Sequence, residues 1–175
     1  DESSSFDPLS EEEQMPVPRL IHRYRDRVVL LVTGSCAMRC RFCFRKRAWT
    51  RGMEMDELSD PDLAGAVSYL TAHPQVREVL ISGGDPLMLP EARLRKIVDA
   101  IAAVPSIEIL RIGSRMPVVW PQRVTPELAR YLGEVEGVWF ATHFNHPREV
   151  TPEAAEACRR LIRSGVPVVN QTVLL

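Results

Sequence analysis

Short apolar runs alternate with segments of helical periodicity along most of the chain, and this alternation restricts the possible folds more than any other feature. The apolar runs lie at residues 27–33, 78–82, 107–112, 138–142 and 166–173. Strands that alternate with helices at intervals of about 30 residues form βαβ units and a parallel sheet. The runs are nearly continuous in apolar character, as in strands covered on both faces. The sequence therefore predicts an α/β fold with a parallel sheet.

The helical segments between these runs carry recognisable start signals. They begin in the sequences SDPDLAG, LPEARL, TPELAR and TPEAAE. In the last two, Thr125 and Thr151 are the expected N-cap residues, because each precedes a proline and an acidic residue in the first turn. Gly165 follows the last segment and is a suitable stop for a helix.

The five predicted βα units are fewer than a closed eight-stranded barrel needs. Two folds remain possible: an open doubly wound sheet, or the first part of a TIM-type barrel. We expect the partial barrel, because a domain seldom stops at the end of a buried parallel strand, and the last run reaches NQTVLL. Its predicted range is 21–175. Residues 1–20 are acidic and proline-punctuated, and are expected to form an N-terminal arm.

Composition excludes several classes of protein. A chain of 175 residues with 45% hydrophobic residues can bury one sizeable core. A net charge of −1 gives no general reason to expect nucleic acid as a partner. The N-terminus does not resemble an export signal, and no apolar run has the length of a membrane span, so a cytoplasmic location is expected. In that reducing compartment, clustered cysteines are metal ligands more often than disulfides.

Three of the four cysteines stand together in the sequence GSCAMRCRFCFRKR. Cys36, Cys40 and Cys43 follow the first predicted strand, and active sites of parallel α/β folds form at such strand ends. A structural zinc site needs a fourth ligand, which usually lies nearby in the sequence. Cys158, the remaining cysteine, is far along the chain in a predicted helix and is interpreted as a structural residue. A cubane iron–sulfur cluster normally takes four thiolates. Three thiolates would leave one iron open to another ligand.

The CxxxCxxC spacing, with an aromatic residue before the last cysteine, resembles the signature of radical S-adenosylmethionine (SAM) enzymes. The resemblance implies a [4Fe–4S] cluster whose open iron binds the methionine part of SAM. One electron then cleaves SAM to a 5′-deoxyadenosyl radical, which abstracts hydrogen from the substrate. The chain is similar from residue 7 to residue 175 to the lysine 2,3-aminomutase family, through the blocks HRYRDR, SGGDPL, RIGSRMPVVWPQRVTPEL, THFNHP and GVPVVNQTVLL. The resemblance to this family implies an isomerase that shifts an amino group from the α to the β carbon of an amino acid such as lysine.

The resemblance also implies site residues. The block after the second predicted strand is assigned to the methionyl amino group of SAM, and consists of Ser82, Gly83, Gly84 and Asp85. Its glycines would let the backbone approach a ligand closely. His143 and Gln171, at the ends of the fourth and fifth predicted strands, are candidates for holding the cofactor, and His146 is interpreted as structural.

Three arginines match positions that bind anions. Arg45 matches the residue that binds the substrate α-carboxylate, a role that suits a guanidinium fork, although it could instead pair with a protein carboxylate. Arg23 and Arg27 match positions near the phosphate of pyridoxal phosphate (PLP), the third implied cofactor. The PLP lysine is not matched: Lys46 and Lys96 are interpreted as surface residues.

The resemblance further implies an electron-donor protein such as flavodoxin or ferredoxin, and a homo-oligomer. Several alternatives stay open from the sequence. The enzyme could make β-lysine for the modification of a translation elongation factor. The chain could be a zinc-stabilised binding module in which RCRFCFRKR contacts RNA or a protein. It could also be an incomplete piece without activity of its own.

Overall fold

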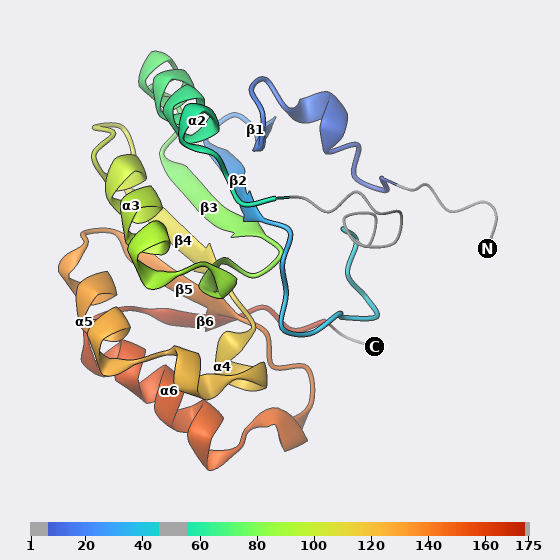
Figure 1. The fold of residues 1–175 in the computed structure, drawn as a ribbon, viewed down its shortest axis with the longest axis vertical. Coiled ribbons are helices and arrows are strands. Elements are labelled where there is room, and N and C mark those ends of the chain that lie inside the picture. The colour runs from blue at the N-terminus through green and yellow to red at the C-terminus, as the bar shows by residue number, and fades with distance from the viewer. Residues whose placement is uncertain (1–6, 46–55, 174–175) are drawn as a thin grey trace.

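The five apolar runs form five parallel strands in the computed structural model, which describes residues 7–45 and 56–173 (Figure 1). The strands are β2 (Arg27–Thr33), β3 (Glu78–Gly83), β4 (Ile109–Gly113), β5 (Val138–Thr142) and β6 (Val168–Asn170). They pair in sequence order, each parallel to the next. A doubly wound sheet reverses its strand order at a switch point, whereas a barrel adds each strand beside the previous one. The observed order therefore fits the partial barrel.

A further strand, β1 (Leu20–Tyr24), was not predicted. It pairs antiparallel with β2, with Leu20 opposite Leu30 and Tyr24 opposite Arg27. The expectation of five strands is corrected to six in the described residues, and the block HRYRDR forms the end of β1 and the turn into β2. The strand lies at the edge of the sheet, where exposed polar side chains are tolerated, so no apolar run marked it.

Helices follow the strands as the start signals predicted. They are α2 (Asp60–Ala72), α3 (Glu91–Ala102), α4 (Met116–Val119), α5 (Pro126–Glu134) and α6 (Pro152–Arg163). The short helix α4 was not predicted. The Oγ1 atoms of Thr125 and Thr151 accept hydrogen bonds of 3.1 Å from the backbone N–H groups of Leu128 and Ala154, so both predicted N-caps are confirmed. Gly165 has a φ of +88° just beyond α6 and ends it as predicted.

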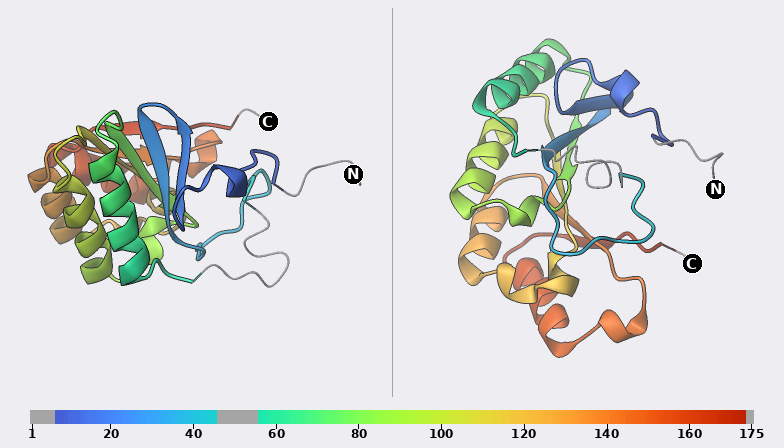
Figure 2. Two further views of the ribbon diagram at one scale, coloured as in Figure 1. Left: turned by 90° about the horizontal axis from the view of Figure 1, so that it is seen from above. Right: turned by 45° about the vertical axis from the view of Figure 1, so that its right-hand side comes forward.

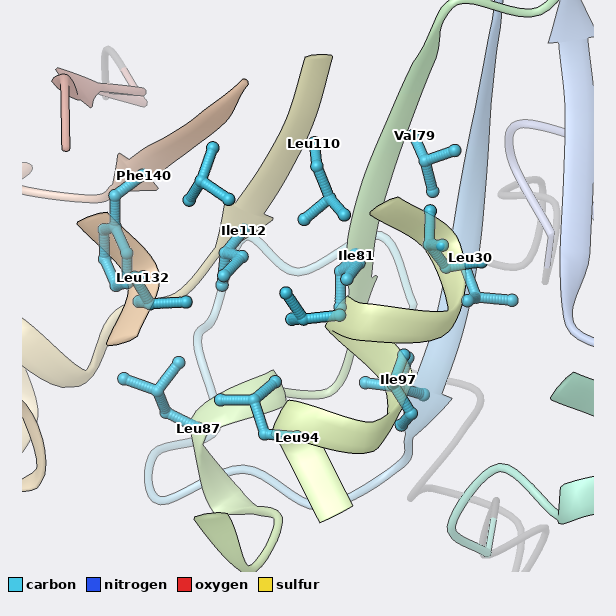
Figure 3. Close-up of a cluster of buried hydrophobic side chains, with 14 of the residues drawn as sticks. Leu30, Val79, Ile81, Leu87, Leu94, Ile97, Leu110, Ile112, Leu132 and Phe140 are labelled. Atoms are coloured by element: carbon cyan, nitrogen blue, oxygen red, sulfur yellow. The ribbon is translucent and has the colours of Figure 1, made fainter. Parts of the chain in front are cut away.

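The main core lies between the sheet and the helices, which cover one face of it (Figure 2). Ile81 and Ile112 point from the strands toward Leu94 and Ile97 of α3, and all four side chains are fully buried (Figure 3). Because side chains alternate across a strand, their neighbours point to the opposite face. In β5, for example, Phe140 is fully buried, whereas its neighbour Trp139 is 37% exposed.

Residues 7–19, from the predicted N-terminal arm, contact the sheet region. They include the 3₁₀ turn η1 (Glu12–Gln14) and Glu11, which is 5% exposed. Val17 forms a bridge with Leu20 at the start of β1. This arm therefore brings a buried carboxylate to the edge of the domain. Among the helices of the described ranges, none has both the length and the apolar character needed to cross a bilayer.

Candidate active site

A cavity of about 400 Å³ lies at the carboxyl ends of the parallel strands. Its wall comes from the loop after β2, which leaves the sheet on the side away from the helices (Figure 2), and from the ends of the four following strands. The carboxyl ends of parallel strands meet at one edge of the sheet, so residues far apart in sequence converge there. Most of the predicted site residues line this cavity: Cys36, Cys40, Cys43, Arg45, Ser82, Gly83, Gly84, Asp85, His143 and Gln171.

The three clustered cysteines are half-buried, and a 3.2 Å hydrogen bond from Cys43 N–H to the Cys40 carbonyl closes the turn that contains the last two. In the described part of the chain, no three His, Cys, Asp or Glu side chains converge on a point where they could bind one metal ion. Zinc needs its ligands around one centre. A cubane instead bonds each thiolate to a different iron, so its sulfur atoms stand apart. Three thiolates at the CxxxCxxC spacing can each bond one iron of such a cluster.

The environment of Cys36 disfavours the negative charge of its thiolate. Burial, together with the nearby negative charges of Asp85, Cys43 and Cys40, raises the pKa of the Cys36 thiol to about 12. A thiol that coordinates a metal is deprotonated because the cation compensates its charge. The Cys36 thiol therefore ionises readily only when a cation, such as an iron of a cluster, compensates its charge.

Gly83 at the end of β3 and Gly84 just after it allow a close contact between two backbone segments. The N–H groups of Gly84 and Asp85 donate to the carbonyl oxygens of Thr33 and Ser35, at 2.5 and 2.8 Å. A Cβ atom on Gly84 would collide with the Ser35 carbonyl, and one on Gly83, whose φ is +124°, would collide with that of Thr33. The glycines thus let two backbones approach each other, and this packing fixes the start of the cysteine loop.

We expect Gly84→Ala to lower the free energy of unfolding by about 3 kcal/mol, because a backbone oxygen cannot move aside without displacing the cysteine loop. Denaturant unfolding measures this change. Gly65→Ala in α2 is the matched control: its added Cβ meets no atom within 4 Å, and alanine should stabilise the helix by about 0.5–1 kcal/mol. Equal stability of the two variants would contradict the role of Gly84.

The carboxylate of Asp85 is buried and engaged by protein groups. Its Oδ1 accepts hydrogen bonds from Ser114 Oγ at 2.7 Å and from Leu87 N–H at 3.0 Å, and its Oδ2 accepts one from Arg115 N–H at 2.8 Å. Burial raises the pKa of Asp85, and these hydrogen bonds act in the opposite direction. Asp85 therefore ties the loop after β3 to the loop after β4. Its contact with a cofactor stays a prediction.

Arg45 forms an ion pair with the N-terminal arm. Its Nη2 lies 2.8 Å from Glu11 Oε1, and its Nε donates to both carboxylate oxygens at 3.0–3.1 Å. Its Nη1 donates to Ser82 Oγ at 3.2 Å. The Arg45 and Glu11 side chains are 12% and 6% exposed. Glu11 is therefore the protein carboxylate that the alternative interpretation of Arg45 requires. The sequence did not indicate this pair, because residues 7–19 show no periodicity.

His143 and Gln171, the remaining two candidates for holding the cofactor, also line the cavity. The Gln171 backbone N–H donates to the Thr142 carbonyl at 2.8 Å. Burial and the positive charge of Arg115 hold the pKa of His143 below its usual value. His143 is therefore suited to act as a neutral imidazole. His146 accepts a 3.1 Å hydrogen bond from Arg148 N–H at the start of the 3₁₀ turn η4 (Pro147–Glu149), which agrees with a structural role.

The residues matched to PLP do not line this cavity. Arg27 stands at the opposite end of β2 from the cysteines and pairs with Asp26 at 3.0 Å and Glu78 at 3.8 Å. Arg23 Nη1 donates to the Leu9 carbonyl at 3.5 Å. Lys96 pairs with Asp60 at 2.6 Å on the helical side, and Lys46 lies outside the described residues. The role of Arg23 and Arg27 near the phosphate of PLP stays a prediction.

One arginine at the site was missed by sequence reasoning. Arg115 Nη1 lies 3.0 Å from Cys40 Sγ, and its Nη2 donates to Glu149 Oε1 at 2.7 Å. The residue lies in the RIGSRMP block, two positions after the end of β4. Its place after a parallel strand was the available signal, since this puts it at the same edge of the sheet as the cysteines.

Comparison with known proteins bears on the family directly. A family model described as the Radical SAM superfamily matches residues 30–175. This chain belongs to the radical SAM superfamily. Membership implies a [4Fe–4S] cluster and SAM, and the cysteines at 36, 40 and 43 supply the CxxxCxxC motif at the cavity.

The relatives have more specific names. The chain is 51% identical over 170 residues to the L-lysine 2,3-aminomutase of Fusobacterium nucleatum, covering 97% of this chain and 40% of that protein. It is 45% identical to that of Bacillus subtilis, covering 97% and 36%. It is 38% identical to the glutamate 2,3-aminomutase of Clostridioides difficile, covering 100% and 41%. The chain thus spans less than half the length of these curated relatives.

Proposed function

We propose that the protein containing this chain is a radical SAM aminomutase that moves the amino group of L-lysine from the α to the β carbon. The observation that carries the proposal is the cavity that brings the three cysteines together with Arg45 and the Ser82–Asp85 block. Relatives named L-lysine 2,3-aminomutase, at 45% and 51% identity, support lysine over glutamate, whose aminomutase is 38% identical.

In this proposal the chain holds and orients the reacting groups. Cys36, Cys40 and Cys43, which line the cavity, would hold three irons of the cluster and would leave the fourth open to SAM. When bound there, the cluster and SAM supply the 5′-deoxyadenosyl radical that takes a hydrogen atom from the substrate. Apolar side chains of the wall, including Leu80 and Val119, limit the access of water to the reacting atoms.

Arg45 binds the substrate α-carboxylate in the same proposal. Glu11 holds its Nε and Nη2 atoms, so the guanidinium keeps one orientation. The Nη1 atom, beside Ser82 Oγ, then offers a donor to an incoming carboxylate. Fixed donors of this kind position the substrate, so that the carbon to be activated stands at a constant distance from the attacking radical.

PLP is the third proposed cofactor, on the strength of the family alone. Arg23 and Arg27 are proposed to lie near its phosphate, and their contacts with the Leu9 carbonyl and with Asp26 keep both guanidinium groups close to β1 and the start of β2. A reduced flavodoxin or ferredoxin is the proposed electron donor, and a reducing cytoplasm the proposed location, since thiolate ligands persist there.

The test uses the full-length protein, reconstituted without oxygen with iron, sulfide and PLP. We expect SAM, a reductant and L-lysine to give β-lysine, at a kcat/KM at least about 100-fold above that for L-glutamate, a difference of about 2.7 kcal/mol in transition-state binding. Chromatography of the derivatised amino acids separates the products. A higher rate with glutamate, or tight binding of one zinc without iron, would contradict the proposal.

A further inference from the structure

Arg115 is the residue outside the predicted site that contacts a cluster ligand most directly. Its Nη1 donates to Cys40 Sγ at 3.0 Å, well within the range of a hydrogen bond to sulfur. Its side chain is only 14% exposed, and its guanidinium carbon lies 5.6 Å from the centre of the Phe42 ring. The positive charge is therefore held beside the sulfur in a largely dry environment, where electrostatic interactions are strong.

Contacts from two further loops fix the position of Arg115. Asp85, after β3, accepts the Arg115 backbone N–H at 2.8 Å. Glu149 pairs with its Nη2 at 2.7 Å, and the other oxygen of Glu149 accepts the Asn145 N–H at 2.8 Å, which anchors the loop after β5. The guanidinium cannot turn away from Cys40 without breaking one of these contacts. The contact between Arg115 and Cys40 is therefore held in place by other residues, unlike the contacts of an arginine side chain that moves freely at the surface.

We propose that Arg115 is a positioning residue for the iron–sulfur cluster, donating a charge-assisted hydrogen bond to the Cys40 thiolate and thereby favouring the reduced cluster. Hydrogen bonds to cluster sulfurs and nearby charge are among the factors that set the reduction potential. The reduced cluster carries one more negative charge, so a cationic donor stabilises it more than the oxidised cluster. The inference rests on the cluster part of the proposed function.

The test is the reduction potential of the cluster in the full-length protein, measured by spectroelectrochemical titration without SAM. In Arg115→Met, which keeps a long side chain but removes charge and donor, we expect the equilibrium constant for one-electron reduction to fall at least tenfold. For a one-electron couple, tenfold equals about 59 mV. Arg41→Met is the matched control: Arg41 lies in the same loop as the cysteines but is exposed, so its change should stay within about twofold.

The outcomes separate this inference from the proposed function. A parent protein without an iron–sulfur cluster overturns both, whereas equal potentials for the Arg115 and Arg41 variants overturn the inference alone. Should Arg115→Met fail to hold a cluster, pulsed electron paramagnetic resonance of the reduced parent protein, labelled with ¹⁵N-arginine, gives the answer. A nitrogen coupling that disappears in Arg115→Lys supports the contact with Cys40. No arginine coupling in the parent, or one unchanged in Arg115→Lys, contradicts it.

Discussion

Cys40→Ala should abolish cluster-dependent chemistry in the full-length protein. Alanine offers no electron pair to iron, and two thiolates cannot replace three in holding a cubane. We expect loss of the iron–sulfur absorbance and formation of 5′-deoxyadenosine at no more than about 0.1% of the parent rate, a loss of at least about 4 kcal/mol of transition-state stabilisation. Iron and sulfide analysis and the visible spectrum measure the loss of the cluster, and chromatography of the nucleoside products measures the loss of SAM cleavage.

Cys158→Ala is the control for the loss of a thiol as such. Cys158 lies in α6, and burial alone raises the pKa of its thiol. The residue is not in the wall of the cavity, so its variant should bind iron and cleave SAM like the parent protein. A Cys40→Ala protein that retained a full cluster would show that other ligands hold it, and the assignment of the cysteines would be wrong.

Arg45→Lys should keep the cluster and lose most of the turnover. Lysine preserves the charge but not the planar fork, so it cannot be held by Glu11 and present a second fixed donor to a substrate carboxylate. The loss of one charge-assisted contact should cost roughly 2–4 kcal/mol of transition-state stabilisation, or about 30-fold to 1000-fold in turnover. Steady-state rates of β-lysine formation, with the visible spectrum recorded on the same samples, provide the measurement.

Two variants separate substrate binding from the ion pair with the arm. Glu11→Gln keeps Arg45 but removes the charge of its buried partner, and should lower the free energy of unfolding by about 3 kcal/mol. Arg41→Lys tests an exposed arginine of the same loop and should change neither property. If Arg45→Lys were less stable but turned over at the parent rate, Arg45 would serve only the ion pair, and its role in binding the carboxylate would be refuted.

Much of the fold was predictable because the signals are local. The apolar runs at β2 to β6 are short and are separated by helical segments, so each indicates a strand. The proline and acidic residue after Thr125 or Thr151 determine where a helix begins. The edge strand β1 was missed because its outer half, ending at Tyr24, is exposed and polar. Its position depends on pairing with β2 rather than on its own composition.

In the candidate site, too, some features depend on local sequence and others on the packing of distant loops. By itself the sequence determined the cysteine spacing and its place after a parallel strand, because ligands seven residues apart are positioned by one loop. Only the tertiary structure decided that Arg115 meets Cys40 across 75 positions and that Glu11 meets Arg45 across 34. Such contacts depend on how separate loops pack at the edge of the sheet. Gly84 shows the same limit, since its close neighbour is the backbone of Ser35 in another loop, which no pattern around the glycine could indicate.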